Sequence, residues 1–276
     1  MLNRAHHPWT RSFTLIAALG ATSCSAFGGG KLDSVACPAL APAADALSMR
    51  FSAQAALDAK VKTFVQAAKD MAAVSQQIEA EAAAACQRMG TDLGLGPAQL
   101  QPRQGPGGAA AGACEAVGMA IDGILRQGVQ VRATLQPPVC QASAQAQARC
   151  AASCDVNADA ECRASCQAHA DVNASCTPAV VTVQASQNAG LALRLVQTLQ
   201  ANLPALIHAE VTLGQRLLGD AKVVAQIGAQ LPNLVGNAGA QAIACIAAAA
   251  DVASSASIRI EVSVRASASV SGRLGT

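Results

Sequence analysis

Cysteine is the residue type in this chain whose number and spacing bear most directly on chemistry. The chain has 276 residues and 11 cysteines, six of which lie in the range Cys140–Cys176. Within that range Cys150 and Cys154 form one C-x3-C pair, and Cys162 and Cys166 form a second. Residues four apart lie on the same face of a helix, one turn above each other. Such pairs can form disulfides in an oxidising compartment, or bind a metal ion as thiolates.

A disulfide-linked hairpin follows if both pairs lie on helices. Two antiparallel helices joined by the turn 155–161 would place the pairs face to face, with Cys150–Cys166 as the outer disulfide and Cys154–Cys162 as the inner one. Cys140 and Cys176 would close the base of the hairpin. The arrangement resembles the twin C-x3-C helical hairpin of small disulfide-stapled proteins, a resemblance of architecture that covers only this stretch.

The alternative is a metal site with Cys162, Cys166, His169 and Cys176 as ligands. Zinc prefers thiolate and imidazole ligands, but usually in tighter C-x2-C spacings. The two interpretations also require different redox compartments, so a targeting signal at the N-terminus would decide between them.

The range Met1–Ser23 has the three parts of a secretory signal peptide. Arg4 and Arg11 give a positive start, the range Ser12–Ala21 is a short apolar core, and small residues then lead to Cys24. The apolar core is too short to span a membrane. We therefore predict export from the cytoplasm.

The ending LGATSC resembles a bacterial lipobox, although Ala21 stands where leucine is usual, and ordinary cleavage nearby is the alternative. The resemblance implies that Cys24 becomes the mature N-terminus and carries a thioether-linked diacylglycerol and an N-acyl chain such as palmitate. More than one buried acyl chain anchors a protein stably. A residue other than aspartate after the cysteine, here Ser25, implies the outer membrane, on its periplasmic face or at the cell surface.

Export favours disulfides, because they persist in oxidising compartments. Without Cys24 ten cysteines remain, an even number that fits five disulfides. Connectivity does not follow from sequence alone. Beyond the hairpin, the pairs that we favour are Cys86–Cys114 and Cys37–Cys245. We expect no metal ion and no cofactor.

Composition limits the possible functions. The chain has 19 lysines and arginines, of which Arg4 and Arg11 lie in the leader, against 17 aspartates and glutamates, so the exported part is neutral. There is no tyrosine, and the one tryptophan, Trp9, also lies in the leader. Without a basic stripe or interleaved aromatic residues, nucleic-acid binding is not expected. Alanine-rich helices also give a thinner core than the aromatic-lined pockets of most enzymes.

A long helix is predicted from Pro42 to Met89. Small and apolar positions step by four and three along it, a heptad seam that favours packing on its own chain, with an intermolecular coiled coil as the alternative. The seam residues are Leu57, Val61, Phe64, Ala68, Met71, Ser75, Ile78, Ala82, Ala85 and Met89. We interpret the charged residues on the opposite face as solvent-facing: Lys60, Lys62, Lys69, Asp70, Glu79 and Glu81.

Further elements follow from glycine, proline and periodicity. A loop rich in proline and glycine covers 100–112, and a second helix covers Ala113–Gln127. If this helix runs antiparallel to the first, as we expect, Cys114 lies near Cys86. Alternating residues predict strands over Val129–Gln136 and Val180–Ser186, held antiparallel by Cys140–Cys176.

The C-terminal part is predicted to be helical and then extended. The range Asn188–Ser254 has helical character with breaks near Pro204 and Pro232. Inside it, Leu234–Ala250 is interpreted as a buried helix and not as a membrane span. The range Ser257–Ser271 alternates apolar and polar residues, so we predict a third strand that completes an antiparallel sheet. One edge of that sheet would remain open, where the charged residues discourage edge-to-edge pairing, and a partner strand added at this edge is the alternative.

The fold class that follows is α+β and predominantly helical. It combines a long antiparallel helix bundle with a small three-stranded antiparallel sheet and the disulfide-linked hairpin. The predicted parts are a signal peptide (1–23), a flexible tether (24–36), a first part of the body (37–139), the Cys-rich hairpin (140–176) and a second part of the body (177–276).

No catalytic motif is present in the sequence. His169 and His208 are the histidines beyond the leader, and Glu210, two residues from His208, lies off its helical face. We expect His208 to be a partly buried structural residue, and we do not expect an enzyme. The favoured function is an outer-membrane lipoprotein with a structural or protein-interaction role and a partner protein in the envelope. The alternatives are a membrane-perturbing helical oligomer and a metal- or thiol-binding module. Composition leaves the oligomeric state open.

Overall fold

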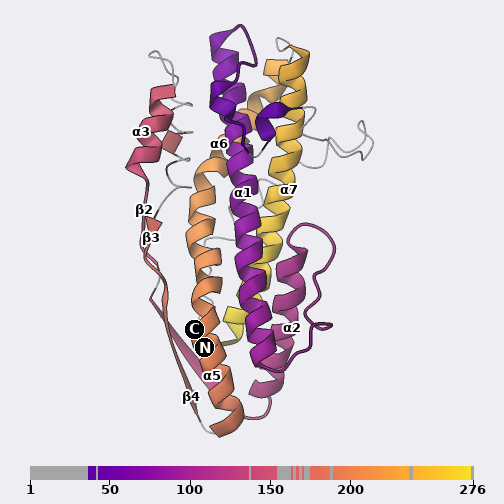
Figure 1. Ribbon diagram of the computed structural model, residues 1–276, viewed down its shortest axis with the longest axis vertical. Helices are drawn as coiled ribbons and strands as arrows, with labels where there is room; N and C mark the ends of the chain where they lie inside the picture. The colour runs from indigo at the N-terminus through magenta and orange to yellow at the C-terminus, as the bar shows by residue number, and fades with distance from the viewer. Residues whose placement is uncertain are drawn as a thin grey trace, which may run out of the picture.

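The longest helix, α1 (Ala55–Asp92), is the central element of the molecule. The computed structural model describes residues 37–41, 43–136, 138–153, 163, 166–167, 170, 175–186, 189–235 and 239–274. These residues are mostly helical, with a small antiparallel sheet. Around α1 lie α2 (Gly108–Leu125), α5 (Ala189–Ile207), α6 (Gly214–Val235) and α7 (Ala240–Ser271), which together form an elongated bundle (Figure 1).

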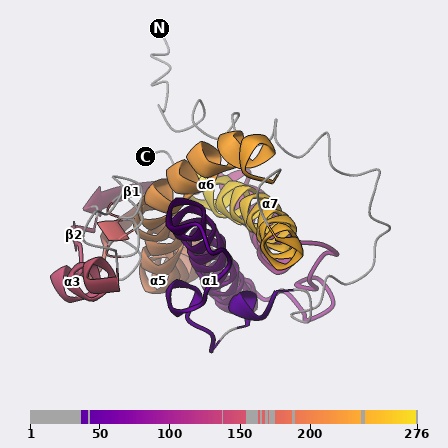
Figure 2. The same ribbon diagram turned by 90° about the horizontal axis from the view of Figure 1, so that it is seen from above.

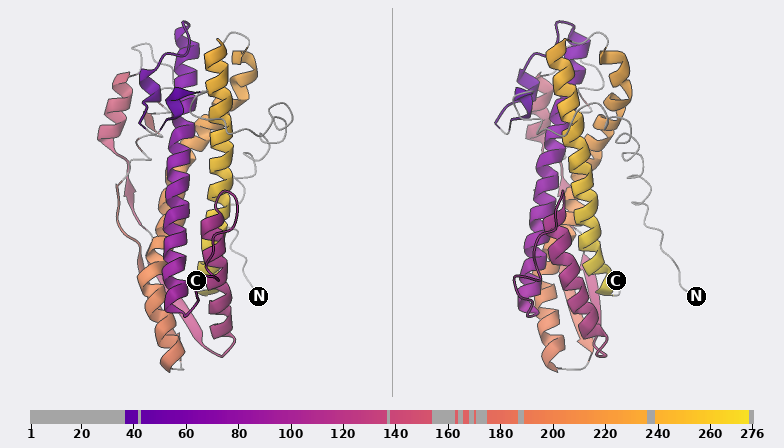
Figure 3. Two further views of the ribbon diagram at one scale, coloured as in Figure 1. Left: turned by 45° about the vertical axis from the view of Figure 1, so that its right-hand side comes forward. Right: turned by 90° about the vertical axis from the view of Figure 1, so that its right-hand side faces the viewer.

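The apolar seam of α1 accounts for its central place, because all ten seam residues are buried within the chain. The core follows α1 along its length. α6 and the first half of α7 surround its N-terminal half, and α2, α5 and the end of α7 surround its C-terminal half. Figure 3 shows the same helices around α1 from two further sides.

We predicted that the charged face of α1 would be exposed to solvent, but several of its side chains contact neighbouring helices instead. The ammonium group of Lys60 donates to Oε1 of Gln230 on α6 at 2.7 Å, and Glu79 forms an ion pair with Arg259 of α7 at 3.1 Å. Oε1 of Glu79 also accepts the N–H of Ala109 in the first turn of α2 at 3.0 Å. A carboxylate is favourable at a helix N-terminus. Because helices pack on α1 from several sides, its charges face neighbours and join the bundle.

The first helix begins at Ala55 and not at Pro42. Two 3-10 turns precede it, Pro38–Leu40 and Ala46–Ser48. Asp58 fixes the approach to α1, because its Oδ1 accepts the N–H groups of Phe51 at 2.6 Å and Ser52 at 3.1 Å. Burial alone would raise the pKa of Asp58, but Lys62 and these two N–H groups outweigh it and lower the pKa.

Helix α2 runs parallel to α1, which corrects the antiparallel arrangement that we expected. Glu79 contacts the start of α2 and Cys86 bonds to Cys114 further along, so both helices advance in the same direction. The 15-residue connection 93–107 makes this possible. Fully extended it would reach about 50 Å, and the way back along α1 to Glu79 is only about 20 Å.

The connection packs closely on α2. A Cβ atom at Gly108 would lie 2.0 Å from the carbonyl oxygen of Arg103, and one at Gly112 would lie 2.1 Å from that of Gln101. The loop 101–103 therefore fills the groove that these two glycines leave on α2. The last part of the predicted loop, from Gly108, is helical.

A two-stranded ribbon follows α2 and packs along α5. Its strands, β1 (Gln130–Gln136) and β4 (Val180–Ser186), pair antiparallel with Ala133 opposite Val183, as the predicted strands require. These two residues are buried and lie on the inner face. Beyond them, β2 (Cys140–Gln141) pairs with β3 (Ser175–Cys176), and the chain between β2 and β3 contains helix α3 (Ala144–Ser153). Figure 2 shows α3 at the edge of the molecule, outside the ring of long helices.

The predicted third strand, Ser257–Ser271, is wrong. This segment is the second half of the continuous helix α7. Its alternation competes with a second pattern, because small and apolar residues also recur every three or four positions, and those residues are the buried ones: Ala249, Ala253, Ala256, Ile260, Ser263, Ser267 and Val270. No glycine or proline interrupts α7, and α1 packs along it, so the helical pattern prevails. Both sheets formed by the described residues are two-stranded.

Pro204 itself lies inside α5, but the α-helix ends three residues later at Ile207, near the predicted break. Proline removes one helical hydrogen bond, and a π-helical segment, His208–Leu213, follows before α6 begins. Pro232 lies inside α6. The predicted buried helix Leu234–Ala250 corresponds to the end of α6 and the start of α7, where Ala242, Cys245, Ile246, Ala248 and Ala249 are buried.

Two helices, α2 and α7, are long and apolar enough to cross a membrane by length and composition. About half of the tested α2 window and 39% of the α7 window is buried inside the bundle. Core helices of soluble proteins pass the same test, so this observation is weak support for a membrane span.

Candidate functional site

Four disulfides join the described cysteines. Cys37–Cys245 links the chain before α1 to α7, and Cys86–Cys114 links α1 to α2, with Cα atoms 4.7 and 4.9 Å apart. Cys140–Cys176 joins β2 to β3, and Cys150–Cys166 lies at α3. These pairs coincide with four of the five that the sequence suggested. The fifth, Cys154–Cys162, and the lipidation residue Cys24 lie outside the described residues.

The alternative metal site is not formed. Cys166 and Cys176, two of its four ligands, are bonded to different cysteines and are not thiolates. Cys162 and His169 lie outside the described residues. In the part of the chain that the structure describes, no three His, Cys, Asp or Glu side chains gather as a metal site.

The Cys-rich segment forms a small head at the end of the ribbon. We use the term head for the described residues between Cys140 and Cys176. The N–H of Ser143 donates to the carbonyl of Ala170 at 3.1 Å, and Nε2 of Gln147 donates to Oε1 of Gln167 at 2.8 Å. Cys166 and Ala170 are buried and helical. As the residue number rises along α3, the residue number of its partner falls, so the two segments are antiparallel, as the predicted hairpin requires.

Apolar side chains are exposed where the ribbon meets the head. Val139 is 65% exposed, Val180 is 51% exposed and Leu135 is 39% exposed. We call these three residues the neck. The backbone there is fixed, since Thr177 N–H donates to the Val139 carbonyl at 2.9 Å and the Thr177 hydroxyl accepts the Val139 N–H at 2.9 Å. Leu135 pairs with Val181, and Val180 pairs with Gln136, so Leu135 and Val180 lie on opposite faces of the ribbon and the neck is exposed on both sides.

The π-helical junction between α5 and α6 carries the described histidine. Nδ1 of His208 lies 2.8 Å from Oε2 of Glu81 on α1, and both side chains are partly exposed. Glu210 instead approaches α7, where the Ser271 hydroxyl donates to its Oε1 at 3.5 Å. The two side chains therefore point to different helices, as their spacing indicates. His208 is the partly buried residue that we expected, held by an α1 carboxylate that sequence reasoning had assigned to solvent.

Burial raises the pKa of Glu210 to about 7, and the hydrogen bond from Ser271 acts in the opposite direction. Perturbed carboxylates occur at functional sites and in structural networks alike. Here Glu210 joins a π-helical segment to the end of α7. We therefore interpret it as a pH-sensitive contact between helices.

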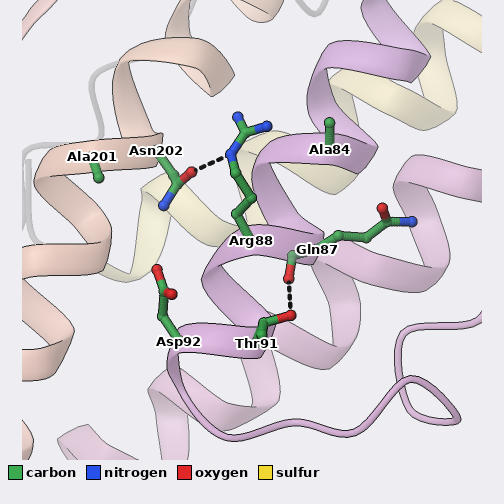
Figure 4. A pocket seen from close by; sticks show the side chains of 7 residues that line it. All are labelled: Ala84, Gln87, Arg88, Thr91, Asp92, Ala201 and Asn202. Atoms are coloured by element: carbon green, nitrogen blue, oxygen red, sulfur yellow. Dashed lines mark hydrogen bonds between the residues drawn. The ribbon is translucent and has the colours of Figure 1, made fainter.

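A cleft of about 570 Å³ lies between the end of α1 and the middle of α5. Its lining residues are Ala84, Gln87, Arg88, Thr91, Asp92, Ala201 and Asn202. Nε of Arg88 donates to Oδ1 of Asn202 at 2.8 Å, and Figure 4 shows this amide between the guanidinium of Arg88 and the carboxylate of Asp92. The cleft is thus lined by one cation, one carboxylate, the uncharged polar side chains of Gln87, Thr91 and Asn202, and alanine methyl groups.

Buried α5 side chains hold both charges. The Thr198 hydroxyl donates to Oδ2 of Asp92 at 2.6 Å, and Nδ2 of Asn202 donates to the Thr198 carbonyl at 3.0 Å. Thr198 is 2% exposed and Asn202 is 3% exposed. Sequence reasoning missed this site, because no motif joins Arg88 to a residue 114 positions away.

No family model, curated protein or solved structure shows significant similarity to the chain. The geometry of the head, the neck and the cleft therefore carries the functional argument.

Proposed function

We propose that the protein is a lipid-anchored lipoprotein of the bacterial outer membrane with a structural or protein-interaction role, and that it is not an enzyme. In this proposal the lipid on Cys24 anchors the chain, the helix bundle is a rigid body, and the head and neck contact another envelope protein.

The observation that carries the proposal is the head displayed on the ribbon. α3 lies apart from the long helices (Figures 1 and 2), and two disulfides, Cys140–Cys176 and Cys150–Cys166, fix the head without the bundle core. The exposed apolar neck lies next to it. A preorganised surface with exposed apolar side chains is suited to protein binding, because little conformational entropy is lost on association.

The decisive experiment isolates the full-length protein from its own membranes in mild detergent and measures the mass and composition of the complex. A stoichiometric complex with another envelope protein supports the proposal, whereas a discrete homo-oligomeric ring contradicts it. A Cys24→Ala variant should lose incorporated acyl chains and leave the membrane fraction. A variant that keeps them refutes the lipid anchor.

A matched pair of variants tests the neck. We expect Val139→Asp to weaken capture of the partner at least about tenfold, because a carboxylate cannot be desolvated in an apolar contact without a large penalty. Met119→Asp is the control, since Met119 is also exposed (59%) but lies on α2, away from the neck. Equal capture by both variants would show that the neck is not the contact surface.

The second candidate is a membrane-perturbing helical oligomer. It is favoured by the length and apolar composition of α2 and α7. Leakage of liposomes by the unlipidated protein would support this candidate, and intact liposomes would count against it.

A further inference from the structure

We infer that the cleft between α1 and α5 binds a small zwitterion, a free amino acid or short peptide, with its carboxylate on Arg88 and its ammonium group on Asp92. The inference does not depend on the lipid anchor or on a partner protein.

The first observation is that Arg88 and Asp92 do not pair with each other. They stand four residues apart on α1, a spacing at which opposite charges usually meet. Two other pairs in the chain with this spacing do meet, Asp58–Lys62 at 2.7 Å and Glu261–Arg265 at 2.6 Å. In both, the acidic residue precedes the basic one, and the reverse order at Arg88 is the weaker orientation. No ion pair joins Arg88 to Asp92 among the described residues.

The second observation is that α5 fixes each charge separately. Asn202 is held by Thr198, which leaves its Oδ1 for Nε of Arg88. The Thr198 hydroxyl donates its hydrogen bond to Oδ2 of Asp92. Because Thr198 and Asn202 are almost fully buried, the two charges are held in place before any ligand binds. Preorganisation of this kind lowers the entropy lost on binding.

The third observation is what the two groups still offer. The guanidinium of Arg88 uses only Nε for a hydrogen bond within the described residues, so its Nη1 and Nη2 groups remain. This planar fork matches a carboxylate. Asp92 keeps acceptor capacity beside the one hydrogen bond from Thr198. It also ends α1, where the helix dipole favours a cation.

The ligand class follows from these groups together. A simple anion would pair with Arg88 but be repelled by the carboxylate of Asp92. A simple cation would pair with Asp92 but be repelled by the guanidinium of Arg88. A molecule with both charges satisfies both groups. The volume of about 570 Å³ is within the range of small-molecule sites, and the methyl groups of Ala84 and Ala201 leave room for a short backbone.

Titration of the full-length protein with glycylglycine tests the inference, followed by the amide NMR signals of residues 84–92 and 198–202. We expect these signals to shift in a saturable manner. N-acetylglycylglycine lacks the ammonium group and glycylglycinamide lacks the carboxylate, and each should bind at least about tenfold more weakly. No saturable shift with glycylglycine, or equal binding of the three probes, would overturn the inference.

Variants then separate the two contacts. Arg88→Gln should reduce affinity for glycylglycine about tenfold while the weak binding of glycylglycinamide is unchanged, and Asp92→Asn should show the reverse selectivity. Arg88→Lys keeps the charge but not the fork and should fall between the original protein and Arg88→Gln. Arg265→Gln is the control, because Arg265 is an exposed arginine of α7 paired with Glu261 outside the cleft. Equal losses in Arg265→Gln and Arg88→Gln, with unchanged unfolding midpoints, would contradict the assignment.

Discussion

At the scale of single residues, Glu210 is the side chain whose chemistry the fold changes most. Its carboxyl lies in the π-helical segment against Ser271 at the end of α7, and burial raises its pKa from 4.5 to about 7. The folded protein therefore binds more protons than the unfolded chain between these two values. By linkage, the contribution of Glu210 to stability is fully present below about pH 4.5 and is lost as the pH rises through about 7.

We therefore expect Glu210→Gln to remove part of the pH dependence of stability. Between pH 5 and pH 8 the original protein should lose on the order of 1 to 3 kcal/mol more unfolding free energy than the variant. Urea denaturation at several pH values measures the difference. Glu261→Gln is the control for loss of a carboxylate at the surface, and a variant slope identical to that of the original protein would contradict the role of Glu210.

At the scale of elements, the preceding loop packs closely on α2 because Gly108 and Gly112 have no side chain. Gly123 also lies inside α2 but does not contact this loop, so it can be compared with Gly112. A Cβ at Gly112 would meet the Gln101 carbonyl oxygen at 2.1 Å, whereas nothing lies within 4 Å of one at Gly123. The same substitution should therefore have opposite effects at the two sites.

We expect Gly112→Ala to destabilise the protein by about 1 to 3 kcal/mol, because the loop must move away from α2. Gly123→Ala should stabilise it by about 0.5 to 1 kcal/mol, because alanine is the better helix former. Thermal or urea unfolding of both variants measures these changes. If both alanines stabilised the protein, the close packing of the loop on α2 would be disproved.

At the scale of the whole molecule, the disulfides divide into two groups. Cys37–Cys245 closes a loop of 208 residues across the bundle, and Cys150–Cys166 closes one of 16 residues within the head. A crosslink that closes a longer loop restricts the unfolded chain more. The long crosslink also joins the start of the described chain to the first turns of α7, beside α1.

Replacing Cys37 and Cys245 together by alanine should lower the unfolding free energy of the bundle by about 3 to 5 kcal/mol. Replacing Cys150 and Cys166 should leave bundle unfolding nearly unchanged but make the head sensitive to proteolysis, because the head opens locally. Denaturant unfolding combined with limited proteolysis distinguishes the two effects. A large loss of bundle stability in the second variant would show that head and bundle unfold as one unit.

The local residue pattern and the cysteine spacing were enough to predict several structural features of this chain. The seam from Leu57 to Met89 has a period that only a helix can bury on one side, and all its members are buried. The strands 130–136 and 180–186 alternate on either side of Cys140 and Cys176, and the antiparallel pairing follows from that symmetry. These features depend on residues close in sequence, or on covalent chemistry that ties distant residues together.

Tertiary packing decided the rest, because it selects among patterns that the sequence leaves equally available. The segment 257–271 alternates like a strand and also has the spacing of a buried helical stripe, and contact with α1 selects the helix. The direction of α2 depends on where the loop 93–107 returns, not on its composition. Arg88, Asp92 and Asn202 line one cleft only because α5 packs antiparallel on the end of α1. Periodicity thus determined the elements, and the packing of helices distant in sequence determined their partners and the charges that they place together.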